Sequence, residues 1–177
     1  MLPEVNEAYF KGINLIPNAE QSYIDIPKAI EEYTPDFYMN VFGYEFYKSL
    51  QDNYDSGVTD SIYYKIMHGS EFTVSGAVYK WDGLINDREI SALADYIWLE
   101  YIEEIWNNTT VGGVVQIVPT ESKQDSRFQR LAKVSNRMEK QIEMLYNFIY
   151  YSTDSELESV KNADYPYKFK ELNWLGI

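Results

Sequence analysis

The chain has 177 residues, the length of one ordinary domain, with no cysteine and a single histidine, His68. This composition excludes disulfides, thiol nucleophiles, cysteine-based metal sites and metal sites built on two imidazoles. The 28 acidic residues outnumber the 15 basic ones and give a net charge of −13, which disfavours sequence-wide binding to DNA or to anionic lipid.

The first part of the chain is predicted to form three helices. Residues 27–33 form a short helix, and Thr34, followed by a proline and an aspartate, caps a second helix that continues to Leu50. A turn cluster separates this helix from a third, short one, which is capped at Asp60 or the residue before it and ends at Gly69.

The second part is predicted to contain a β excursion and two long helices. Residues 70–80 alternate around Gly76, which indicates a β-hairpin or an extended excursion. A long helix follows over residues 87–107, and a glycine-hinged, β-rich segment over 111–118 leads to the longest helix, over 120–152. We expect these two glycine-hinged segments either to reorder on docking or to pair with the sheet edge of another chain. The expected buried stripes of the two long helices are Ile90, Leu93, Ala94, Ile97, Tyr101 and Ile105 in the first, and Phe128, Leu131, Met138, Ile142, Leu145 and Ile149 in the second.

These elements predict a mainly α protein, a helical bundle with a long C-terminal helix and small β-hairpin or extended excursions. We divide the chain into an N-terminal arm (1–24), a helical domain (25–152) and an aromatic C-terminal arm (153–177). The C-terminal arm has candidate partner-docking aromatics, because free termini rarely hold so many. They are Tyr165, Tyr167, Phe169 and Trp174.

No motif for nucleotide binding, hydrolysis, zinc or calcium is present, so we predict no catalytic residue, cofactor or metal. Glu100, Glu103 and Glu104 share one helix at spacings that can hold a divalent metal, but the histidine of the di-metal helix pattern is absent. We therefore interpret them as an acidic face, either solvated or inter-subunit. His68 fits a helix C-terminal cap better than a catalytic base.

Basic residues concentrate on the longest predicted helix, since residues 119–152 contain six basic and four acidic side chains. The six recur at steps of three and four and form a stripe beside the apolar one. The stripe is either a solvated face, a contact to an acidic neighbouring subunit, or a contact to DNA phosphates. Its members are Lys123, Arg127, Arg130, Lys133, Arg137 and Lys140. The 17 tyrosines are open to two interpretations of similar weight, a filled core or a partner-facing surface.

Several segments in this order resemble one family. They are Gly43–Tyr47, Tyr64–Gly69, Trp81–Leu84, Asn108–Gln116 and Asn136–Met138. Together they are similar to the small head–tail connector proteins (adaptor or neck ring proteins) of tailed bacteriophages, closest to those of gut Bacteroidetes and crAss-like phages. The resemblance covers roughly residues 25–150.

The resemblance implies a non-enzymatic structural protein of the virion, made in the host bacterial cytoplasm. Such connectors form a ring, commonly of twelve copies, below the portal; they extend the DNA channel and join head to tail. The implied partners are further copies of the chain, the portal protein, other neck or tail proteins, and double-stranded DNA that passes without specific binding. No 18-residue apolar run is present, so no membrane partner is expected. Two alternatives remain: another phage tail-completion or assembly protein, and a DNA-contacting accessory protein.

Overall fold

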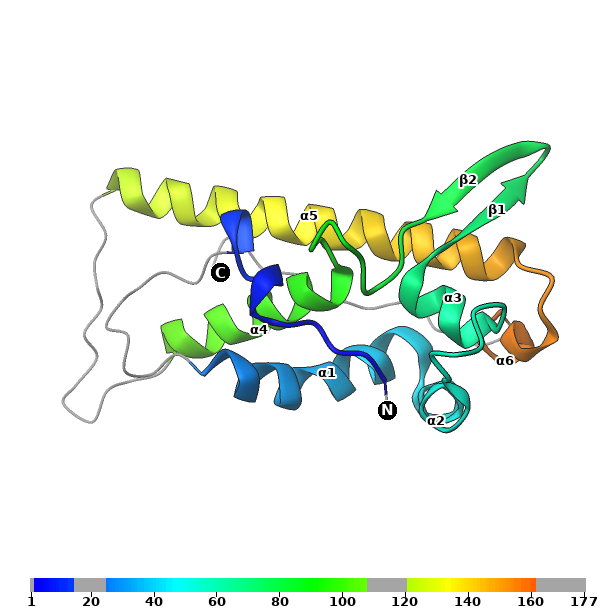
Figure 1. Ribbon diagram of the computed structural model, residues 1–177. Coiled ribbons are helices and arrows are strands. Elements are labelled where there is room, and N and C mark those ends of the chain that lie inside the picture. The colour runs from blue at the N-terminus through cyan, green and yellow to red at the C-terminus, as the bar shows by residue number, and fades with distance from the viewer. Residues whose placement is uncertain (1, 15–24, 108–120, 162–177) are drawn as a thin grey trace.

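The computed structural model describes residues 2–14, 25–107 and 121–161, with the side chains of residues 13, 103–107, 121–128 and 159 outside that description (Figure 1). The described chain is mainly helical, with one two-stranded hairpin, which confirms the predicted fold class.

The first helix, α1 (Ile26–Phe42), corrects a predicted boundary. It passes through Pro35, where the sequence predicts that one helix ends and another begins. Proline inside a helix costs about 3 kcal/mol, but Ile30 before it and Phe37 after it are both buried in the same core. Burial on both sides of the proline therefore outweighs the local stop signal.

The chain breaks instead at Gly43, whose φ of 77° and ψ of 162° suit glycine alone. Gly43 ends α1 and begins α2 (Tyr44–Asn53), so one predicted helix is two. Figure 1 shows α2 end-on while α1 runs across the view, so the chain turns sharply at this glycine.

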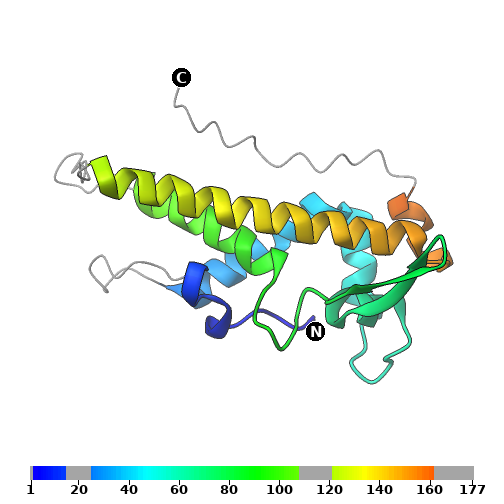
Figure 2. The same ribbon diagram turned by 90° about the horizontal axis from the view of Figure 1, so that it is seen from above.

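Helix α4 (Ala92–Asn107) lies between α1 and α5 (Glu121–Tyr151), and the three run side by side (Figures 1 and 2). Every residue from Ala92 to Leu99 is buried, because α4 has a neighbour on two sides. The sequence predicts this helix from residue 87. The helix begins instead at Ala92. Ile90, which the sequence places in the buried stripe, therefore lies before the helix and is 42% exposed.

The stripe predicted for α5 is confirmed where its side chains are described. Its members Leu131, Met138, Ile142, Leu145 and Ile149 are all buried. Ser135, which interrupts the apolar spacing, is buried as well. The predicted helix bounds differ from the observed ones by one residue at each end.

At the base of the hairpin, the backbone around Gly69 lies in close contact with the backbone around Gly83. Helix α3 (Ile62–His68) is capped by Ser61 and not by Thr59 or Asp60, the predicted caps, and it ends at Gly69 as predicted. Strands β1 (Ser70–Val74) and β2 (Ala77–Trp81) follow, antiparallel, around a two-residue turn. A Cβ on Gly69 would lie 2.4 Å from the Trp81 carbonyl oxygen, and a Cβ on Gly83 would lie 2.5 Å from the His68 carbonyl carbon. Glycine at both positions lets the two backbones touch.

The described parts of both predicted arms contribute to the same core. In the N-terminal part, which contains the 3₁₀ turns Glu7–Tyr9 and Gly12–Asn14, Val5, Tyr9 and Phe10 are buried. After α5, the 3₁₀ turn Ser155–Leu157 and the short helix α6 (Glu158–Lys161) bury Leu157 and Val160.

Candidate interaction surfaces

One member of the predicted basic stripe, Arg137, points into the molecule. Its Nε donates to Oδ2 of Asp95 at 2.8 Å, and its Nη2 donates to Oδ1 of the same carboxylate. The Nη2 also donates to the side-chain oxygen of Asn14 at 2.9 Å, and the Asn14 amide donates back to Asp95 at 2.7 Å. The cluster therefore joins α4, α5 and the N-terminal segment.

The carboxylate of Asp95 has no solvent exposure, whereas the Arg137 side chain is 28% exposed. Burial raises the pKa of the Asp95 carboxyl, and the hydrogen bonds and charge of Arg137 and the bond from Asn14 oppose that rise. The sequence prediction missed Asp95. Its signal was an aspartate within the apolar run from Ala92 to Ile97, where only a paired carboxylate is stable.

A second stripe member, Arg130, also lies against the protein. Its guanidinium carbon is 5.0 Å from the ring centroid of the buried Trp98, a cation–π geometry. Partial burial lowers the pKa of Arg130. The two described arginines of the stripe thus stabilise the contact between α4 and α5.

The described solvent face of α5 has little net charge. Lys133 and Lys140 are exposed, but Glu139 and Glu143 are exposed on the same helix. Two positive and two negative charges give no cationic stripe along residues 129–151. The side chains of Lys123 and Arg127 lie outside the described residues.

Of the predicted acidic face, Glu100 is half-buried on α4, and the side chains of Glu103 and Glu104 lie outside the description. The four candidate docking aromatics (Tyr165, Tyr167, Phe169 and Trp174) also lie outside the described residues. Exposed acidic side chains are frequent on α1 and α2. These two helices have five exposed acids but only two exposed lysines, Lys28 and Lys48. The exposed acids of these helices are Glu31, Glu32, Asp36, Glu45 and Asp52.

His68 is the last residue of α3, as predicted, and has two aromatic neighbours. Its Nε2 shares a 2.8 Å hydrogen bond with the Tyr54 hydroxyl, and its ring centroid is 4.4 Å from that of Tyr64. Burial lowers the pKa of His68, which favours the neutral ring over the cationic cap that the sequence suggests.

Four of the eight large apolar side chains that are exposed in the described residues lie on β2 or in the last turn of α5. Val78 and Tyr79 on β2 are 67% and 46% exposed, and Tyr150 and Tyr151 are 68% and 42% exposed. The two elements touch through Phe72 on β1. Its ring lies 5.7 Å from that of Tyr79 and 5.8 Å from that of Phe148 on α5. These four exposed residues, Val78, Tyr79, Tyr150 and Tyr151, are called the hairpin-end patch below.

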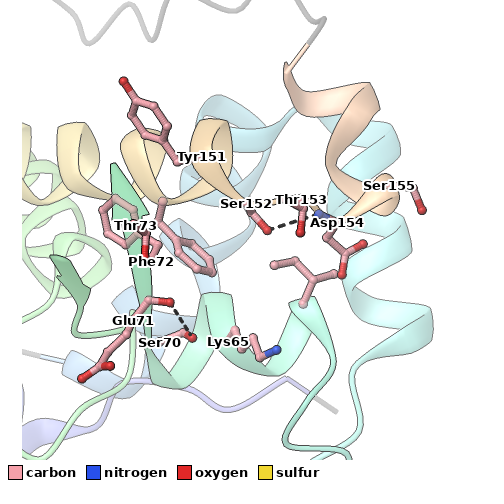
Figure 3. A pocket seen from close by; sticks show the side chains of 12 residues that line it. Lys65, Ser70, Glu71, Phe72, Thr73, Tyr151, Ser152, Thr153, Asp154 and Ser155 are labelled. Atoms are coloured by element: carbon pink, nitrogen blue, oxygen red, sulfur yellow. Dashed lines mark hydrogen bonds between the residues drawn. The ribbon is translucent and has the colours of Figure 1, made fainter. Parts of the chain in front are cut away.

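An open groove of about 660 Å³ lies beside this patch (Figure 3). Its strand residues, 70–73, all belong to β1. The opposite wall is the end of α5 with residues 152–155, and α3 contributes Ile62 and Lys65. The lining residues Ile62, Phe72 and Phe148 are buried, and most of the groove surface is polar, with Lys65, Glu71 and Asp154 among the lining residues.

Other kinds of site are not found in the described part of the chain. Among residues 2–14, 25–107 and 121–161 no group of three or more acidic or histidine side chains is placed to hold a metal ion. Within the same ranges, no helix is both long and apolar enough to cross a membrane.

Comparisons with known proteins do not assign the chain to a family. No family model matches it, and neither a curated protein nor a solved structure is significantly similar to it.

Proposed function

We propose that this protein is a structural head–tail connector of a tailed bacteriophage, which forms a ring below the portal and extends the DNA channel. The observation that carries the proposal furthest is the hairpin-end patch. Four apolar or aromatic side chains, each at least 42% exposed, lie on β2 and in the last turn of α5. Such a grouping is typical of a surface that a protein partner covers.

The charge distribution supports a role next to DNA without binding to it. The acidic surface of α1 and α2, defined by Glu31, Glu32, Asp36, Glu45 and Asp52, repels a polyanion. A channel lined by such a surface would leave passing DNA mobile. The balanced charge of the described face of α5 also gives no phosphate-binding stripe.

The positions of the two described arginines of the stripe disfavour the DNA-contacting alternative. That alternative needs the arginines of the stripe to be available for phosphates, but Arg137 is paired with Asp95 and Arg130 lies over Trp98. A gel shift at moderate salt tests it directly. The alternative survives if the purified protein shifts duplex DNA and Lys133→Glu with Lys140→Glu abolishes the shift.

The proposal itself is tested by mixing the purified protein with its cognate portal and examining the mixture by native mass spectrometry and electron microscopy. We expect a ring on the portal. Tyr79→Ser with Tyr150→Ser should reduce its formation, whereas Tyr44→Ser, which alters a 61% exposed tyrosine on α2, serves as the matched control. Binding to tail-tube components with no binding to portal would instead identify a tail-completion protein.

A further inference from the structure

The free edge of β1 faces the groove described above. The turn residues Ser75 and Gly76 both have positive φ (50° and 86°), as in a two-residue type I′ hairpin. In such a hairpin the closing pair, Val74 and Ala77, exchanges both hydrogen bonds, and pairs then alternate along the ladder. The backbone groups of Glu71 and Thr73 therefore point away from β2.

No second strand pairs with this edge within the described residues, where the sheet has two strands. The groove lies along β1 and is closed on its far side by the end of α5, so it leaves open the backbone edge that an added strand needs. Ile62, Phe72 and Phe148 also line it but are at most 8% exposed, so the main contact that the groove offers to such a strand is the backbone of β1.

We propose that this groove binds residues 111–118 of a second copy of the chain, which adds as a strand to β1. The sequence of this segment, VGGVVQIV, has five β-branched residues, and residues 108–120 contain no charged side chain. A strand without charged residues brings no charge of its own into the groove. Pairing also covers a segment whose composition is prone to aggregation when it is exposed.

The geometry of the chain requires that the bound segment come from another molecule. Asn107 and Glu121, which flank it, lie at one end of the three long helices, and the hairpin lies at the other end (Figure 1). The 31 residues of α5 span about 45 Å. A segment of 13 residues held at both ends reaches at most about 25 Å from its anchors.

Opposite ends of one molecule thus have complementary features, an open strand edge and a strand-forming segment. Contacts of this kind join copies head to tail and give a closed ring when the rotation between copies is suitable. The identity of the ring rests on the proposed function. The contact between β1 and residues 111–118 of a second copy is a separate claim about which surfaces meet.

The absence of native cysteine permits a direct test by disulfide cross-linking. Thr73→Cys is mixed with variants that have a single cysteine in the segment (Val114→Cys, Val115→Cys or Ile117→Cys), over a range of concentrations and on rings assembled with portal. Mild oxidation should give a cross-linked heterodimer for at least one segment position. One chain with Thr73→Cys and the best segment cysteine should give a ladder of multimers. Lys48→Cys, on the exposed face of α2, replaces Thr73→Cys as the control.

A proline variant tests the backbone contact. Thr73→Pro removes the N–H that points away from β2 and breaks no hydrogen bond between β1 and β2, whereas Thr73→Val keeps that N–H. We expect Thr73→Pro to weaken self-association about tenfold relative to Thr73→Val, the effect of one lost hydrogen bond. Near-ultraviolet circular dichroism checks that both variants are folded.

Three possible results distinguish a failure of this inference from a failure of the proposed function. No cross-link above the Lys48→Cys control in any condition, the portal-assembled ring included, overturns the inference. Cross-linking of Thr73→Cys to Phe169→Cys in place of the segment variants also overturns it, because the C-terminal segment would then occupy the groove. Cross-linked rings that do not bind portal leave the inference standing and remove the proposed function.

Discussion

The guanidinium of Arg137 on α5 donates two hydrogen bonds to the carboxylate of Asp95 on α4, and this carboxylate has no exposure to solvent. Asn14 bonds to both groups, so the ion pair also anchors the N-terminal segment. A residue that the sequence places on a solvated or partner-facing stripe is therefore part of the packing between helices.

We predict that Arg137→Ala lowers the free energy of unfolding by about 3–5 kcal/mol, because it leaves the buried Asp95 without a counter-charge. Lys133→Ala, an exposed change on the same helix, should stay within about 0.5 kcal/mol of the wild type. Urea denaturation followed by circular dichroism measures both. The double variant Asp95→Leu with Arg137→Met should recover most of the loss, and equal losses for Arg137→Ala and Lys133→Ala would contradict the structural role.

The pH dependence of the free energy of unfolding should reveal the lowered pKa of His68. Its folded-state pKa lies below the ordinary value of 6.5, so the unfolded chain binds more protons between these two values. The stability that comes from the neutral ring is present above pH 6.5 and is lost as the pH falls toward the folded-state pKa. Relative to His68→Gln, the wild type should therefore lose stability as the pH is lowered from 7 to 5.5.

Because His68 is the only histidine, urea titrations of the two proteins at several pH values isolate this effect. Wild type and His68→Gln curves that stay parallel across the range would show that the ring has the same proton affinity in both states.

Substitution of Gly69 should be far more damaging than substitution of Gly76. Both have positive φ, at 93° and 86°, so both alanine variants incur the backbone cost of about 1–2 kcal/mol. A Cβ on Gly69 would also lie 2.4 Å from the Trp81 carbonyl oxygen, whereas a Cβ on Gly76 meets nothing within 4 Å. We expect Gly69→Ala to lower the thermal unfolding midpoint well below that of Gly76→Ala. Similar midpoints would mean that the base of the hairpin is not closely packed.

Phe148 anchors the hairpin to α5 through its ring contact with Phe72. Phe148→Ala should cost about 3–5 kcal/mol, as for other buried aromatic truncations. It should also speed amide hydrogen exchange in β1 and β2 more than in α4, because the hairpin has few other contacts with α5. Tyr150→Ala, at a 68% exposed position two residues along, is the control and should leave hydrogen exchange in the strands unchanged.

Local patterns predicted much of the fold. The 3.6-residue spacing of Leu131, Met138, Ile142 and Leu145 predicted α5, and Gly69 correctly marked the end of α3. The alternation around Gly76 predicted a β-hairpin or an extended excursion, and the structure has the hairpin, with Gly76 at positive φ in its turn. In each case the signal lies within a few residues, and the tertiary structure agrees with it.

The sequence by itself determined the helical class, the β segment around Gly76 and the negative net charge, since these depend on spacing and composition. Only the tertiary structure decided that α1 continues through Pro35, that the chain turns at Gly43, and that Arg137 pairs with Asp95 across 42 positions. Burial on both sides of Pro35 and the contact between α4 and α5 decided the first and last of these points, because the free energy of burying side chains can exceed a residue's local preference. The groove along β1 arises in the same way, from three elements that are separated in the sequence and meet only in the folded chain.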